Sequence, residues 1–303
     1  MIKRTLFFKN PAYLSTKNNQ LVINYPGEDQ ATKTVPIEDI GMLVLENQQI
    51  TISNGLLSKL IQNKAAIINC DRFHLPISLL QPLVGHSEQT ERMRHQLNAS
   101  IPLQKNLWQQ TITAKIKNQA KFLEKQNIPN RKMYKWANEV KSGDSENHES
   151  RAAVYYWQHI FGLKNFTRGQ HGSAPNHLLN YGYAILRAIT ARALVSSGML
   201  PSVGIFHRNK YNAYCLADDI MEPYRIFVDV LVNDIIQSNG VTEDLTTSLK
   251  MSLLQLPVMD VIIDGHKSPL MVAMSRTTNS LYECFLGKSR KILYPDFHDS
   301  KRT

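Results

Sequence analysis

A carboxylate on the inward face of an expected helix is the first candidate for chemistry. The helix expected over about residues 146–163 carries Ala152, Tyr156 and Ile160 on one face, and a step of three residues back from Ala152 reaches Glu149. An inward carboxylate needs a cation or several hydrogen-bond donors, because an unpaired charge in an apolar setting is costly. A salt bridge to an arginine, or exposure at the helix edge, would also account for Glu149, so its companions decide its meaning.

Those companions lie together in one later segment of the chain. His207 follows a short apolar run and can offer a neutral imidazole nitrogen, while Asp218, Asp219 and Glu222 lie one or two turns apart before a further helix. Two carboxylates and a histidine form a mixed oxygen and nitrogen ligand set, which suits Mg²⁺ or Mn²⁺ better than zinc. This segment therefore predicts a divalent-cation site in company with the first carboxylate.

Two residues of this segment also have structural alternatives. Pro223 fits the first turn of the following helix, which makes Glu222 the expected N-cap residue, although Glu is a poorer cap than Asp, Ser or Asn. Arg225 can clamp a DNA phosphate or pair with Asp229 one helical turn later. A helix-capping role for Glu222 and an ion pair for Arg225 are therefore the alternatives to metal binding and DNA binding.

Basic side chains surround these acids in the sequence and alternate with tyrosines, a combination that suits DNA phosphates and the packing of bases or sugars. The candidate DNA-binding residues are the basic side chains of these segments and of the C-terminal region, with two residues of a long helix expected over 175–197: Arg151, Arg208, Lys210, Arg225, Lys288, Arg290, Asn180 and Tyr181. Gly182 in that helix costs about 1 kcal/mol against alanine. This cost indicates that another group packs closely against Gly182, either a second helix or bound DNA.

The elements that must position these residues change character near residue 84. Short apolar or alternating runs predict strands before it, with one helix at Asn54–Gln62 and a hairpin turn at Asn18-Asn19. A helical period follows, with helices expected over 89–104, 106–126, 131–140, 146–163, 175–197, 223–238, 243–254 and 269–286. We therefore expect an α+β protein with a β-strand-rich domain over residues 1–84 and a larger all-α-helical catalytic domain over residues 85–303.

The composition indicates a folded protein whose net positive charge attracts polyanions. The 303 residues are 43% hydrophobic, and 35 Lys and Arg against 25 Asp and Glu give a net charge of +10. Nucleic acid is the first partner to consider, with a merely basic surface as the alternative. The chain has no run long enough to span a bilayer and no export signal in sequence, so we expect a cytoplasmic protein with no membrane partner. Its three widely spaced cysteines are expected to be reduced core thiols.

Four ordered motifs resemble the CRISPR-associated adaptation integrase, the Cas one family. They are His148-Glu149-Ser150-Arg151-Ala152-Ala153, Asn180-Tyr181-Gly182-Tyr183-Ala184-Ile185-Leu186, Gly204-Ile205-Phe206-His207-Arg208 and Leu216-Ala217-Asp218-Asp219-Ile220-Met221-Glu222-Pro223-Tyr224-Arg225. The last acid is Asp in much of that family. The glutamate within Met221-Glu222-Pro223-Tyr224-Arg225 resembles the members found in type II systems.

The resemblance implies a catalytic metal site of Glu149, His207 and Glu222 that holds Mg²⁺ or Mn²⁺, with Asp219 as a further candidate ligand. It implies spacer acquisition in the bacterial cytoplasm, in which the 3′-OH of a short DNA fragment attacks a phosphodiester at the edge of a CRISPR repeat. A metal-dependent nuclease of branched DNA and a non-catalytic DNA-binding scaffold are the alternatives. A chelator would change nothing for the scaffold.

A fragment with two ends needs two active sites, so we expect a homodimer. The resemblance implies that the N-terminal domain serves dimerisation and contacts to partners or double-stranded DNA. It also implies a small Cas two dimer that bridges two such dimers, with other type II Cas proteins as further partners.

Overall fold

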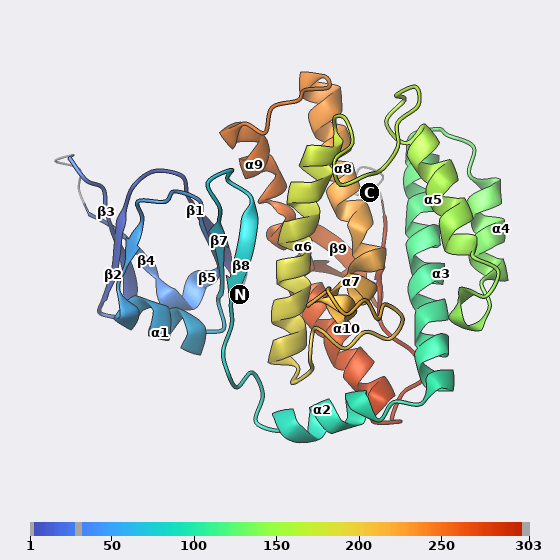
Figure 1. Cartoon of the computed structure of the whole chain (residues 1–303), viewed down its shortest axis with the longest axis horizontal. Helices are drawn as coiled ribbons and strands as arrows, with labels where there is room; N and C mark the ends of the chain where they lie inside the picture. The colour runs from blue at the N-terminus through green and yellow to red at the C-terminus, as the bar shows by residue number, and fades with distance from the viewer. Residues whose placement is uncertain (1–2, 28–31, 299–303) are drawn as a thin grey trace. The chain divides into compact units, whose positions relative to one another are not determined.

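The structure is a computed structural model that describes residues 3–27 and 32–298 (Figure 1). The chain forms two compact units, residues 1–87 and residues 88–303. The sequence led us to expect a boundary between residues 84 and 85. Every predicted metal ligand belongs to the second unit.

In its described residues, the N-terminal unit contains two four-stranded sheets, one α-helix and a 3₁₀ turn at Ile37–Asp39. One sheet has the order β1-β5-β7-β8, formed by Arg4–Phe8, Ile40–Leu45, Ala66–Cys70 and Pro76–Leu80. The other has the order β4-β3-β2-β6, formed by Lys33–Pro36, Gln20–Asn24, Tyr13–Lys17 and Thr51–Ile52. Helix α1 spans Asn54–Gln62, as the sequence predicts, and buries Leu56 and Leu60 in the core that the sheets share.

The turn between β2 and β3 confirms the expected hairpin. Lys17 pairs with Gln20, and the two residues between them, Asn18 and Asn19, have φ of 50° and 57°. Asparagine tolerates the left-handed region better than most residues, and a two-residue turn of this twist matches that of the flanking strands.

The C-terminal unit is mainly helical. Its helices are α2 Gln89–Leu97, α3 Ile101–Lys125, α4 Arg131–Glu139, α5 His148–His159, α6 Asn176–Ser196, α7 Cys215–Met221, α8 Arg225–Asn239, α9 Thr247–Leu253 and α10 Leu270–Phe285. Among the described residues, no helix is long and apolar enough to cross a membrane. The three cysteines are buried thiols, which agrees with the expected core thiols.

Helix α3 is the element on which the site is built. The hydroxyl of Ser100 accepts a hydrogen bond from the backbone N–H of Leu103, and Pro102 lies in the first turn, where its missing N–H costs nothing. The helix contacts α4, α5, α7 and α8, while α6 packs against α7, α8 and α10 (Figure 1). Residues far apart in sequence thereby meet along α3.

The architecture confirms the α+β class, with strands first and helices after them. The helical unit also contains a small sheet of order β10-β9-β11 that the sequence did not lead us to expect, formed by His266–Pro269, Asp260–Ile263 and Pro295–Asp296. Its strands are only two to four residues long. Periodicity cannot be read over so few positions, although Asp264-Gly265, at φ 52° and 73°, is a typical hairpin turn between β9 and β10.

Candidate metal centre

The carboxylate of Glu149 is fixed by the start of α5. Asp144 accepts hydrogen bonds from the backbone N–H groups of His148 and Glu149, both at 2.9 Å. These bonds satisfy donors in the first helical turn, where no partner within the helix exists. The side chain of Glu149 is 24% exposed, so it lies at the rim of the protein interior.

Glu222 lies deeper, at the junction of two helical segments. It is the C-cap residue of α7 and begins a 3₁₀ turn, Glu222–Tyr224, while the N-cap residue of α8 is Tyr224. The prediction that Glu222 caps the following helix was therefore wrong, because the chain was already helical before Pro223. The buried carboxylate instead accepts a hydrogen bond on Oε1 from Nε of Arg225 at 2.9 Å.

A lysine joins the two glutamates. Nζ of Lys115, in the middle of α3, lies 2.7 Å from Oε1 of Glu149 and 2.7 Å from Oε2 of Glu222. Lys115 was not among the residues predicted from the sequence. Its helical spacing nevertheless places it on the face of α3 that carries the buried residues Thr111 and Ile112. The two carboxylates thus lie close enough to share one cation.

The third predicted ligand, His207, lies on a loop that Asp219 holds in place. Asp219 is fully buried and accepts from the backbone N–H groups of Ile205, Phe206 and His207 at 2.7, 2.9 and 3.3 Å. A Cβ at Gly204 would fall 2.4 Å from the carbonyl oxygen of His207, so only glycine fits this turn. Asp219 thereby works as a loop anchor.

Asp219 also orients the imidazole of His207. Nδ1 lies 2.5 Å from Oδ1 of Asp219, and the ring meets Trp108 edge-on at 5.6 Å. The bond to Asp219 raises the pKa of His207, burial opposes that rise, and the nearby charges of Glu222 and Glu149 add to it. Nδ1 is taken by a carboxylate, so Nε2 is the nitrogen that a metal would use.

These residues suit a divalent cation in their chemistry. Oε2 of Glu222 is buried and, although Lys115 is near, it accepts no hydrogen bond of acceptable geometry. Two carboxylates and one imidazole nitrogen with a carboxylate behind it are a common ligand set for such ions. In the described part of the chain no three His, Cys, Asp or Glu side chains are arranged as a metal-binding group, and the cation between the two glutamates is Lys115.

Comparison with known proteins identifies the family. The family model described as CRISPR associated protein Cas1 matches residues 6–261. The chain is also 35% identical, over 97% of its length and 95% of the relative's, to the CRISPR-associated endonuclease Cas1 of Neisseria meningitidis serogroup C (strain 8013). The chain belongs to the Cas1 family.

Solved structures agree with this assignment of the fold. A casposase bound to integration product has a TM-score of 0.76 and 18% identity, and the match covers 96% of this chain and 92% of that one. A Cas6-RT-Cas1–Cas2 complex has a TM-score of 0.72 and 18% identity, covering 95% of this chain and 35% of the matched chain. The strands and helices described above are thus those of a Cas1 fold.

Two further acids of this Cas1-family chain do not join the glutamates. Asp218 pairs with Arg187, whose Nε and Nη2 lie 2.7 and 3.0 Å from its two oxygens. Asp229 is buried and accepts from the hydroxyls of Tyr156 and Tyr183. Since Arg225 hydrogen-bonds to Glu222, the expected alternative of an Arg225–Asp229 pair is not the arrangement found.

The predicted DNA-binding residues fall into three groups. Arg151, Arg208, Lys210, Lys288 and Arg290 are exposed, and Arg225 and Asn180 are half-buried and engaged with protein groups. Tyr181 is 1% exposed and lies in the core, so its side chain does not reach the surface in this structure, and its contact with DNA stays a prediction. The helical period places Tyr181 on the packed side of α6, one residue from Asn180 on the open side.

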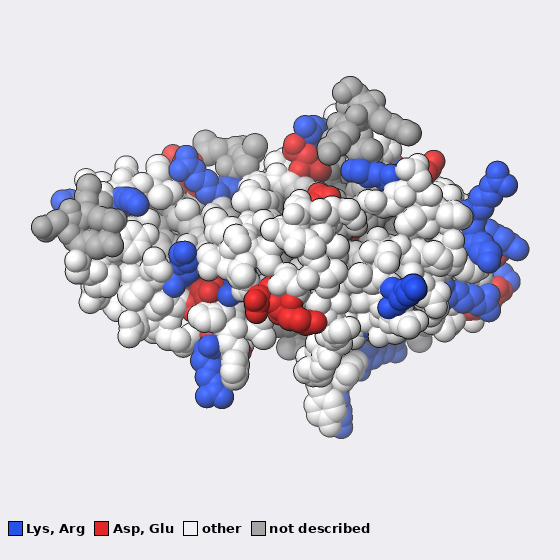
Figure 2. Space-filling model, turned by 90° about the horizontal axis from the view of Figure 1, so that it is seen from above, with Lys and Arg blue, Asp and Glu red and all other residues white. Residues whose placement is uncertain are grey.

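On the face that Figure 2 shows, Lys and Arg side chains do not form one continuous patch. Figure 2 shows one face of the molecule, on which Lys and Arg side chains stand singly or in small groups. Among the exposed candidates, Arg151 follows Glu149 by two residues and Arg208 follows His207 directly, and Nη2 of Arg208 donates to Gln104 at 2.9 Å. Arg151 and Arg208 are therefore the exposed candidates that lie nearest in sequence to the proposed metal ligands.

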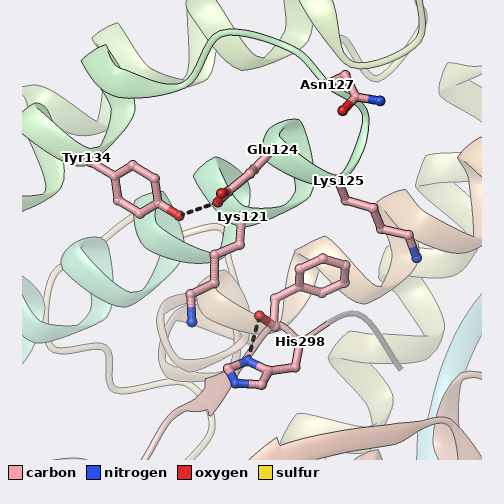
Figure 3. Close-up of a pocket in the computed structure, with 7 residues that line it drawn as sticks. Lys121, Glu124, Lys125, Asn127, Tyr134 and His298 are labelled. Atoms are coloured by element: carbon pink, nitrogen blue, oxygen red, sulfur yellow. Dashed lines mark hydrogen bonds between the residues drawn. The ribbon is translucent and has the colours of Figure 1, made fainter. Parts of the chain in front are cut away.

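A pocket of about 610 Å³ lies at the C-terminal end of α3, lined by Lys121, Glu124, Lys125, Asn127, Tyr134, Phe297 and His298 (Figure 3). The hydroxyl of Tyr134 donates to Glu124 at 3.1 Å, and Lys121 pairs with Asp296. Lys121 follows Lys115 by six residues, or about 9 Å along the helix axis. This pocket is distinct from the glutamate pair.

Proposed function

We propose that this member of the Cas1 family is a metal-dependent DNA integrase of spacer acquisition, which joins the 3′-OH ends of short DNA fragments to a CRISPR repeat by transesterification. The observation that carries the proposal is that Glu149 and Glu222, from separate helical elements, share one cation at 2.7 Å from each. The oriented imidazole of His207 belongs to the same charge cluster.

The metal would be held by Glu149, Glu222 and Nε2 of His207, and Mg²⁺ or Mn²⁺ suits these donors. When bound, a divalent cation supplies charge stabilisation at the phosphoryl oxygens and lowers the pKa of the attacking hydroxyl. Asp219 would hold the imidazole as a neutral ligand by accepting the proton on Nδ1.

The exchange of bonds needs no other reactant. The 3′ oxygen of the fragment forms a bond to the phosphorus of the repeat, and the bond from that phosphorus to the 3′ oxygen of the repeat strand breaks. The proton lost by the attacking hydroxyl is balanced by the proton gained by the new 3′-OH. The exposed Arg151 and Arg208 would neutralise neighbouring phosphates without reading sequence.

Hydrolysis is the second candidate function, because the Neisseria relative is named an endonuclease. The same ligands could direct water instead of a 3′-OH at the phosphodiester of a branched DNA. The solved casposase, in contrast, is bound to an integration product. An integrase makes a larger, branched molecule from two DNAs and a nuclease makes only smaller ones, so product size distinguishes the two functions.

We also propose a homodimer that works with a small Cas2 dimer, as the solved Cas6-RT-Cas1–Cas2 complex contains both kinds of protein. In the N-terminal unit, β8 is one of the two outer strands of its sheet, and Phe73, Ile77 and Leu83 in and around it are exposed apolar side chains. Such an edge is suited to pairing with a second chain. Light scattering of the wild type and of Ile77→Asp tests this, with a shift to monomer expected.

The catalytic assignment is tested by separating strand joining from DNA binding. Glu149→Gln and Glu222→Gln remove a ligand charge and should lower joining by at least about a hundredfold. DNA affinity should stay within about threefold, because the proposed phosphate contacts come from other side chains. Glu139→Gln, on the surface of α4, is the matched control. Equal loss of joining and binding in the glutamate variants would overturn this division of roles.

A further inference from the structure

Lys115 is placed where the proposed metal would be held. Its side chain is 11% exposed, and its Nζ touches one oxygen of Glu149 and one of Glu222. The lysine comes from α3, whereas the glutamates come from α5 and from the turn after α7. The contact therefore exists only because three separate segments pack together at this point.

The charges at this point require a cation. Arg225 binds Oε1 of Glu222, but of the two basic groups only Lys115 has an ion pair with both glutamates. The Nζ of Lys115 lies 2.7 Å from an oxygen of each glutamate, and the lysine side chain is 11% exposed, so the ion pairs are largely shielded from water. Two carboxylates this close, one of them buried, would repel each other if the ammonium were absent.

The ammonium and a divalent cation would use the same oxygen atoms. Mg²⁺ binds carboxylate oxygens at about 2.0–2.1 Å, and Oε1 of Glu149 and Oε2 of Glu222 both lie 2.7 Å from the ammonium of Lys115. An ammonium that stayed in place would meet a second cation at van der Waals range, where like charges repel. The metal can take both oxygens only if Lys115 leaves them.

We propose that Lys115 is the internal counter-cation of the metal-free site, holding Glu149 and Glu222 together until a divalent cation displaces it. This inference rests on the proposed metal dependence. Metal binding is then an exchange of one cation for another, and the affinity for metal is set partly by the strength of the contacts that Lys115 gives up. Lys115 is a positioning residue for the ligands in the absence of metal.

The first test compares Mn²⁺ binding by calorimetry, at one fixed pH, in the wild type, Lys115→Met and Lys117→Met. Lys115→Met should bind Mn²⁺ about tenfold or more tightly, because the competing charge is gone. The same variant should melt at a lower temperature without metal and recover when Mn²⁺ is added. Lys117→Met, an exposed lysine two residues further along α3, should match the wild type in both measurements.

A second test uses the wild type alone and does not depend on a variant that folds. Lysines are acetylated with N-hydroxysuccinimide acetate, with and without saturating Mn²⁺, and modification is followed by mass spectrometry. Release from the glutamates should raise the labelling rate of Lys115 severalfold and leave that of Lys117 unchanged.

Each outcome bears on a separate claim. A wild type that binds no Mn²⁺ or Mg²⁺ would contradict the proposed metal dependence and, with it, the exchange. A wild type that binds Mn²⁺ while Lys115→Met binds equally or more weakly, or while Lys115 labelling stays constant or falls, would overturn the exchange and leave metal dependence standing.

Discussion

Nδ1 of His207 lies 2.5 Å from Oδ1 of Asp219, and this contact decides which imidazole nitrogen is left for a ligand. The same carboxylate accepts from three successive backbone N–H groups of the loop that carries the histidine. Loop position and ring orientation therefore depend on one buried side chain. Asp219, expected as a candidate ligand, holds the loop and the imidazole of His207, the proposed ligand.

The first prediction concerns how metal binding depends on pH. A metal needs neutral His207, so affinity should rise with pH through the pKa of that imidazole, which Asp219 raises above 6.5. Asp219→Asn removes the main cause of the rise and should move the midpoint of Mn²⁺ affinity to lower pH. Calorimetric titrations across a pH series measure this midpoint.

Asp218→Asn is the matched control for that series. Asp218 is the neighbouring acid, and it pairs with Arg187 and Asn212 rather than with His207. Its substitution should leave the midpoint where the wild type has it. If Asp219→Asn also leaves the midpoint unchanged, Asp219 does not set the proton affinity of the histidine.

The second prediction concerns the cap of α5. Asp144→Ala removes the acceptor of the His148 and Glu149 N–H groups and should lower the free energy of unfolding by about 1–2 kcal/mol. It should also reduce strand joining, since Glu149 is in the turn that loosens. Urea unfolding and the joining assay measure the two effects, with Ser145→Ala as control. Full activity in a destabilised Asp144→Ala variant would show that the cap does not position Glu149.

The third prediction concerns the buried Asp229. Burial raises its pKa from 3.8 to about 6, even though hydrogen bonds from Tyr183 and Tyr156 act in the opposite direction. Between about pH 4 and pH 6 the folded state keeps a proton that the unfolded state has lost. This group alone therefore makes stability fall as pH rises through that window, by about 3 kcal/mol in total.

Asp229→Asn carries no ionisable group at this position. The free energy of unfolding of the variant minus that of the wild type should increase from about pH 4 to about pH 6 and then level off. Asp234→Asn, on the exposed face of α8, controls for helix effects. A difference that stays constant over this range would refute the raised pKa of Asp229.

The fourth prediction concerns the close approach of α6 and α8. A Cβ at Gly182 would lie 2.4 Å from Cγ1 of Val228, so Gly182→Ala should cost roughly 1–3 kcal/mol of stability despite the better helix propensity of alanine. Val228→Ala should recover part of this loss in the double variant. A double-mutant cycle measures the coupling, and strictly additive effects would mean that the helices do not collide there.

How far the sequence predicts the site depends on the range over which each residue acts. Residue type and local pattern indicated Glu149 and the segment that holds His207, Asp218, Asp219 and Glu222, and the family resemblance then singled out Glu149, His207 and Glu222. Gly182 indicated a close contact that the structure assigns to Val228. Lys115 could not be assigned, because its partners lie 34 and 107 positions away, counted from the residue numbers, and meet it only through helix packing. The carboxylate partner of Arg225 could not be decided either, since Glu222 and Asp229 are both within one helical turn of it.

The differences between the structure and the sequence-based expectations have physical causes as well. Tyr181 belongs to a motif beside the site, but helix rotation turns it into the core. Glu222 was expected to cap a helix because Pro223 suits a first turn, yet α7 had already begun at Cys215. The sheet of β9, β10 and β11 has strands too short to show a period.

Metal-dependent strand joining can be measured by following the label of a short DNA duplex. The protein and a small Cas2 partner are incubated with an end-labelled short duplex and a repeat-containing plasmid, with Mg²⁺ or Mn²⁺ and in parallel with EDTA. For a metal-dependent integrase, we expect that label moves onto the plasmid only when metal is present, and that Glu149→Gln and Glu222→Gln stop the transfer. Label transfer that persists in EDTA, or plasmid cleavage with no transfer under any condition, would contradict a metal-dependent integrase.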